Sequence, residues 1–102
     1  MIYEKLWKAI DLEIPLVLTD METFLVRDGE ITEDDLKNAK LAAKKVRDAY
    51  EAKNKDASIK LVQEAISILN SIKPKKPFPP EMKIRFEDLK KTLEECINDS
   101  KE

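Results

Sequence analysis

Glycine occurs only once in this chain of 102 residues, at Gly29. Strands need frequent turns, and turns use clusters of glycine, asparagine and aspartate, so this scarcity predicts long helices joined by few loops. Apolar residues make up 42% of the sequence, which suits one modest core and is too high for a disordered chain. We therefore expect a single all-α domain over residues 1–102, folded as an antiparallel helical bundle of four to five helices.

The first 31 residues form a predicted N-terminal helical extension. Ile2, Leu6 and Ile10 recur every four residues, as they would on one face of a helix. Pro15 then predicts a bend, because proline fits the first turn of a new helix and drives the preceding residue toward extended backbone.

Residues 15–31 fit two structures. Apolar residues at helical spacing favour a helix capped by Gly29, and these residues are Val17, Met21, Phe24 and Leu25. The stretch "TFLVRDGEIT" also fits a hairpin that turns at Asp28 and Gly29. An isolated two-stranded hairpin is only marginally stable, so we predict the helix.

Residues 32–99 form a predicted three-helix core. The first of these helices begins at Thr32, with Asp35 three residues later in a variant of the capping box. Its expected buried face consists of Leu36, Ala39, Ala43, Val46 and Tyr50. Together with Ala42, the two alanines of this face would let a neighbouring helix approach closely.

The second core helix spans residues 56–72 and is apolar on two sides, which predicts contact with helices on both sides. One apolar stripe contains Ile59, Val62, Ile66 and Leu69, and the other contains Leu61, Ala65, Ile68 and Ile72. The third helix spans residues 80–97. Its expected buried face contains Met82, Phe86, Leu89, Leu93 and either Cys96 or Ile97.

Most of the prolines fall in the stretch "IKPKKPFPP", residues 72–80, which we call the proline segment. It satisfies the P-x-x-P pattern of proline-rich docking motifs. It also suits a structural strap, because proline favours extended backbone and lowers the entropic cost of spanning two helix ends. We favour the strap, with Phe78 anchored on the core near Leu69 and Ile72 and with the lysines in water.

The composition offers no catalytic signature. Histidine is absent, and the single cysteine, Cys96, lacks an imidazole partner to activate it. Acidic neighbours such as Asp34 and Asp35 fall in the first turn of a helix, where carboxylates stabilise the helix dipole. We therefore expect a non-enzymatic protein that uses no metal or cofactor.

Charge and hydropathy indicate the cellular location of the protein and the partners that it attracts. Its 19 basic and 21 acidic residues give a formal net charge of −2, so no overall basic excess attracts nucleic acid. No apolar run approaches the roughly 20 residues needed to cross a bilayer, and the N-terminus lacks a signal-peptide core. We expect a soluble, cytoplasmic protein. Abundant lysine and glutamate with one glutamine, Gln63, favour a thermophilic source.

Residues 36–90 resemble the MIT (microtubule-interacting and trafficking) domain, a three-helix bundle found on AAA ATPases and other ESCRT proteins. The likeness is in "AKNKDASIKLVQEAISIL", residues 52–69, and in "RFEDLK", residues 85–90. Ser58 stands where the family has alanine, and Val62 stands where it has an aromatic residue. The proline-rich connection is shorter than in the family, and residues 1–31 have no counterpart in a minimal MIT domain. The same spacing also fits a tetratricopeptide-type helical hairpin.

The resemblance implies a protein-interaction module that binds a partner helix or peptide between helices, against residues 81–97. The expected groove residues are Leu61, Ile68, Ile72, Met82, Ile84 and Phe86. Ile84 falls off the main stripe of its helix, so we expect it to be partly exposed.

Two alternative functions remain open at this point. One is a nucleic-acid-associated accessory protein that uses a basic patch, consisting of Lys73, Lys75, Lys76, Lys83 and Arg85. The other is a structural subunit that buries Tyr3, Trp7 and Phe24 in a homodimer. Strong salt dependence would indicate nucleic-acid binding, whereas the solution mass would reveal a homodimer.

Overall fold

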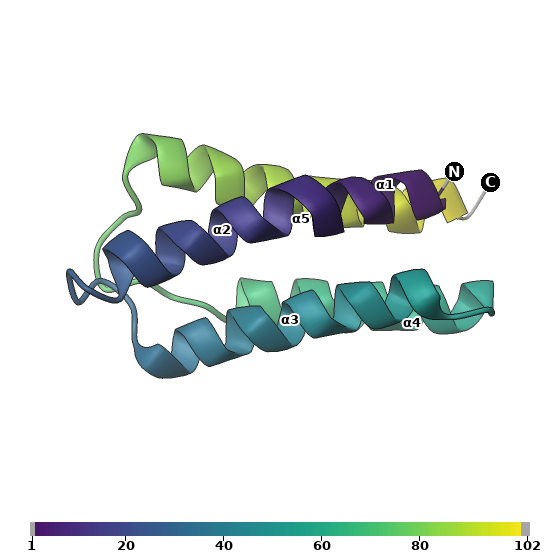
Figure 1. Ribbon diagram of the computed structural model, residues 1–102, viewed down its shortest axis with the longest axis horizontal. Coiled ribbons are helices and arrows are strands. Elements are labelled where there is room, and N and C mark those ends of the chain that lie inside the picture. Colours follow the sequence, from purple (N-terminus) through teal and green to yellow (C-terminus); the bar gives the residue numbers. More distant parts are fainter. Residues whose placement is uncertain (1, 101–102) are drawn as a thin grey trace.

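The computed structural model describes residues 2–100, and the side chains of residues 3–99. Its elements are α1 (Ile2–Lys8), a π-helical turn (Ala9–Glu13), α2 (Ile14–Asp20), a second π-helical turn (Met21–Leu25), α3 (Glu33–Glu51), α4 (Lys55–Asn70) and α5 (Pro80–Ser100). No strand occurs among the described residues (Figure 1), so the predicted all-α class is confirmed.

Residues 2–25 form one continuous helix, which we call the N-terminal helix. The backbone keeps right-handed helical angles at its junctions, including Lys8, Ile14 and Asp20. The bend predicted at Pro15 is therefore wrong, because Ile14 before it keeps helical rather than extended backbone angles. Pro15 lies in the first turn of α2, and the wider π-helical turn before it accommodates a residue that cannot donate a backbone hydrogen bond.

The N-terminal helix ends in a glycine cap. Gly29 has a φ of 77°, a left-handed conformation that favours glycine. The Glu30 N–H donates to the Leu25 carbonyl over 2.9 Å, and the Gly29 N–H donates to the Val26 carbonyl over 3.1 Å. This pair of bonds is the Schellman motif. Within residues 15–31, the predicted helix capped by Gly29 is therefore confirmed in place of the hairpin, with helical backbone to Leu25 and a turn after it.

Side-chain caps begin the next two helices. At α3 the Asp35 N–H donates to Thr32 Oγ1 over 3.1 Å, and the Thr32 N–H donates to Asp35 Oδ2 over 3.2 Å, as the capping box predicts. At α4 the Ala57 N–H donates to Asn54 Oδ1. Because only residues 52–54 separate the two helices, α4 returns alongside α3 (Figure 1).

The core lies between two pairs of neighbouring helices. Figure 1 shows the N-terminal helix beside α5, and α3 beside α4. The buried apolar side chains form one cluster: Leu6, Ala9, Ile14, Val17, Met21, Leu25, Ile31, Ala39, Ala42, Val46, Ala49, Val62, Ala65, Leu69, Ile72, Phe86, Leu89, Leu93 and Cys96. The N-terminal helix therefore packs into the same core as the three later helices.

The most buried faces of α3 and α4 differ in part from the prediction. Tyr50 was expected in the core but is 38% exposed, because its ring packs against Trp7 at the edge of the contact with the N-terminal helix. On α4, Ile66 is half-buried and Val62 is fully buried. The buried Ser58 hydroxyl donates to the Ala49 carbonyl over 2.7 Å, which joins α4 to the end of α3.

Candidate functional site

The six residues predicted to line a groove on α4 and α5 differ in their exposure. Ile72 and Phe86 are buried in the core and line one shallow depression. Leu61, Ile68 and Met82 are half-buried. Ile84 is 59% exposed, as its position off the main stripe predicts.

The proline segment packs onto α5 at this depression. The ring of Phe78 is half-buried and meets the ring of Phe86 edge to face, with centroids 5.4 Å apart. The Lys75 N–H donates to the Glu30 carbonyl over 2.6 Å, which joins the proline segment to the end of the N-terminal helix. These contacts are those of a strap. Ile72 lines the same depression as Phe78, as predicted, and the ring partner of Phe78 is Phe86.

The predicted basic patch is divided between two environments. All four lysines are exposed, and Lys73 and Lys83 also line the depression beside Phe78. The Arg85 guanidinium instead donates two hydrogen bonds to the Asp20 carboxylate, over 2.6 and 2.9 Å. These bonds raise the pKa of Arg85. Sequence reasoning missed this pair because Asp20 comes from a distant helix.

The three aromatic residues of the homodimer hypothesis do not gather in one place. Tyr3 is half-buried and Trp7 is 50% exposed, and both rings contact Tyr50. Phe24 is 46% exposed and lies about 25 Å further along the N-terminal helix, as the rise per residue requires.

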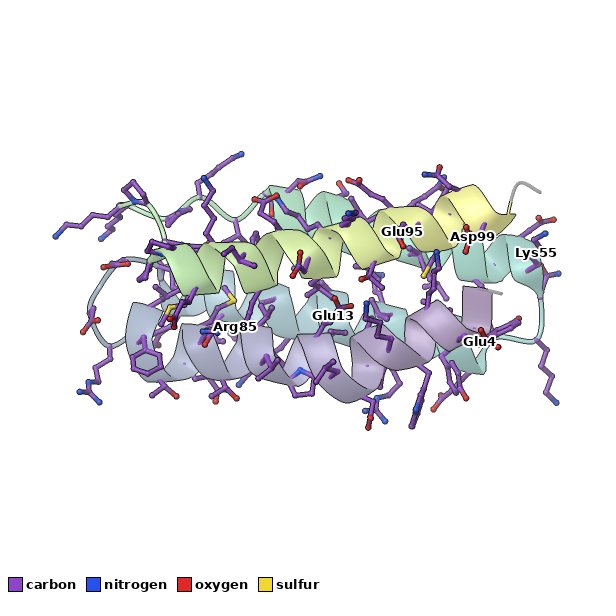
Figure 2. All side chains as sticks on the ribbon, turned by 90° about the horizontal axis from the view of Figure 1, so that it is seen from above. Glu4, Glu13, Lys55, Arg85, Glu95 and Asp99 are labelled. Carbon is purple, nitrogen blue, oxygen red and sulfur yellow. The ribbon has the colours of Figure 1, made fainter. Side chains whose placement is uncertain are left out.

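A row of polar contacts fixes the N-terminal helix on α5. Figure 2 shows Glu13 and Arg85 between these two helices, with Glu95 and Asp99 further along α5. The Thr92 hydroxyl donates to Glu13 Oε2 over 3.0 Å, and Lys5 pairs with Glu95 and Asp99 at 3.0 and 2.9 Å. One side of α5 is thus covered by this chain's own N-terminal helix.

A concave surface lies between the N-terminal helix and α3, and we call it the α2–α3 groove. Its volume is about 490 Å³. One side and the floor are formed by Ile10, Ile14, Pro15 and Leu18 of the N-terminal helix; α3 contributes Lys40, Ala43, Lys44 and Arg47. Sequence reasoning did not predict this groove.

One alanine of α3, Ala43, explains why the groove is hollow. Ala39 and Ala42 are buried against the core, and the half-buried Ala43 lines the groove itself. A methyl side chain at position 43 leaves open the space beside Ile14 and Leu18 that a longer side chain would fill. The run of small residues was therefore the sequence signal for this surface.

Basic side chains occupy only the α3 side of the groove. Lys40, Lys44 and Arg47 stand at positions i, i+4 and i+7, so they share one helix face. None of the lining residues is acidic. Lys40 pairs with Glu22 outside the groove at 3.0 Å, and both side chains are about half exposed.

The reactive groups of the chain are elsewhere and are covered. Burial raises the pKa of the Cys96 thiol to about 11. Glu13 is buried, and its Oε1 atom accepts no hydrogen bond within the described part of the chain. Among residues 2–100, His, Cys, Asp and Glu side chains form no group of three or more that would hold a metal ion. No described helix is both long enough and apolar enough to span a membrane.

No protein-family model, curated protein or solved structure matches this chain. The resemblance to the MIT domain therefore stays a prediction.

Proposed function

We propose that this chain is a non-enzymatic protein-interaction module, an antiparallel helical bundle that binds one helix of a partner protein in the α2–α3 groove. The observation that supports this most is the groove of about 490 Å³ with its apolar floor. Helix-in-groove recognition uses this arrangement, in which the apolar face of an amphipathic helix is laid between two helices.

The spacing of the floor residues suits a helical partner. Ile10, Ile14 and Leu18 recur every four residues, so they repeat about every 6 Å along the N-terminal helix. A partner helix presents its own apolar residues at the same interval and can pack between them. A peptide strand would need an exposed sheet edge instead, and the described residues include no strand.

The reactive groups support binding rather than catalysis. The chain contains no histidine, and the thiol of Cys96, with a pKa of about 11, stays protonated at neutral pH. The polar groups of the α2–α3 groove are cations on flexible side chains, which suit electrostatic attraction better than proton transfer.

Selection of helical peptides on the purified protein tests the proposal. A library of amphipathic helices is displayed, and the dissociation constants of the selected peptides are measured by fluorescence anisotropy. We expect Ala43→Gln to weaken binding by about ten-fold or more, because the longer side chain occupies the groove.

The matched control is Leu41→Gln, two residues away on α3. Leu41 is exposed and outside the groove lining, so this variant should bind as the wild type does. Circular dichroism melts establish that both variants fold. Selection of no helical peptide, or equal binding by both variants, would contradict the proposed function.

A further inference from the structure

We infer that the partner helix bears carboxylates along one edge of its apolar face, so that the occupant of the α2–α3 groove is an acidic amphipathic helix. This inference rests on the proposed function. Its basis is the asymmetry of the groove, where Lys40, Lys44 and Arg47 line the α3 side and apolar residues line the other.

The spacing of the three cations defines the expected acidic pattern. At a rise of 1.5 Å per residue, Lys40 and Lys44 are about 6 Å apart along α3, and Lys44 and Arg47 are about 4.5 Å apart. A partner helix parallel to α3 matches this row with carboxylates at i, i+4 and i+7. A partner in the opposite orientation matches it with carboxylates at i, i+3 and i+7.

The cations are available to such a partner. Lys40 and Glu22 are both about half exposed, and Lys44 approaches Asp48 only to 3.8 Å with its own side chain 73% exposed. Exposed pairs of this kind contribute little free energy, so the ammonium groups can turn toward a new carboxylate. Arg47 is exposed and has no ion pair within the described residues.

The apolar side of the groove favours a peptide over a nucleic acid. A phosphate backbone bound by Lys44 and Arg47 would cover Ile14 and Leu18 with charged groups, which apolar side chains cannot solvate. An amphipathic helix satisfies both sides at once, because its apolar face covers the floor and its carboxylates meet the cations.

Three model helices of about 20 residues, long enough to hold helical structure, test the charge pattern. They share one apolar face and carry Glu, Gln or Lys at the three edge positions. Anisotropy at low and physiological salt gives each dissociation constant. We expect the Glu helix to bind about ten-fold more tightly than the Gln helix, since three exposed ion pairs together contribute on the order of 1–2 kcal/mol. This advantage should shrink as salt rises.

Charge reversal on α3 tests whether Lys44 and Arg47 cause the preference for the Glu helix. The double variant Lys44→Glu, Arg47→Glu should lose the preference for the Glu helix and bind the Lys helix more tightly. Lys60→Glu on α4, at an exposed position outside the groove lining, is the control and should keep the wild-type order.

Three other outcomes of these binding measurements would contradict the inference. Equal affinity for the Glu and Gln helices, with Ala43→Gln still blocking both, overturns the acidic partner and leaves the proposed function standing. Tighter binding of a DNA duplex than of the Glu helix, lost in the double variant, replaces the peptide by a nucleic acid. Failure of all three helices to bind overturns the proposed function together with this inference.

Discussion

Arg85 on α5 and Asp20 at the end of α2 form a two-pronged ion pair, with N···O distances of 2.6 and 2.9 Å. The Asp20 side chain is 10% exposed and the Arg85 side chain is 33% exposed. Together with the Thr92–Glu13 hydrogen bond, this pair sets the register of the N-terminal helix on α5. That register also decides where the N-terminal helix stands relative to α3, and hence where the α2–α3 groove opens.

The two halves of this ion pair should respond unequally to mutation. Arg85→Ala leaves the buried Asp20 carboxylate without its partner, whereas Asp20→Ala leaves a guanidinium that can reach water. We expect Arg85→Ala to lower the melting temperature more than Asp20→Ala does. Thermal melts of the single and double variants check this. The double variant should melt above Arg85→Ala, and a double variant that melts below both single variants would contradict the assignment.

Core substitutions on α4 should follow the observed burial. Leu69 is buried, so Leu69→Ala should lower the free energy of unfolding by about 2–5 kcal/mol. Ile66 is half-buried, so Ile66→Ala should lower the free energy of unfolding by about 1–2 kcal/mol. This cost is smaller than the one expected if Ile66 were fully buried, as the sequence pattern indicated. Urea unfolding measures both values. An equal cost for the two variants would show that the buried face is misassigned.

The proline segment should depend on Phe78. Its ring is half-buried against Phe86, so Phe78→Ala should lower the free energy of unfolding by about 2 kcal/mol. Lys75→Ala and Lys76→Ala should stay within about 0.5 kcal/mol of the wild type, because both side chains are exposed. Thermal melts of the three variants measure these effects. An unmoved midpoint for Phe78→Ala would indicate a docking motif instead of a strap.

Stability should fall at alkaline pH through Cys96. Burial raises the pKa of its thiol to about 11, from about 9 in the unfolded chain. The unfolded chain therefore loses this proton first, so the contribution of Cys96 to stability is complete below pH 9 and is lost as the pH rises toward 11. Urea unfolding from pH 8.5 to 10.5 should show a shallower decline for Cys96→Ala than for the wild type. Parallel declines would contradict the raised pKa.

Local signals in the sequence predicted the ends of helices. The capping box of Thr32 and Asp35 and the glycine cap at Gly29 both depend on residues within about one helical turn, and the structure contains both. The π-helical turns were not predictable in the same way. Proline at position 15 is compatible with a break or with a continued helix, and packing of the N-terminal helix along its whole length decides between them.

Contacts between distant elements limited what the sequence could say about the site. Asp20, the partner of Arg85, is 65 residues away in the sequence. Residue spacing could therefore not reveal that Arg85 forms an ion pair instead of belonging to the basic patch. The α2–α3 groove likewise depends on how the N-terminal helix crosses α3. Its only sequence signal was the set of small residues at Ala39, Ala42 and Ala43, which indicated a close helix neighbour but not a groove.

Backbone NMR of the 102-residue protein tests the central claim most directly. On titration with a selected helical peptide, we expect the largest changes in amide chemical shift at Ile14, Leu18 and Ala43, around the α2–α3 groove. Changes concentrated instead at Ile68, Met82 and Ile84 would contradict the account and place the partner on α4 and α5.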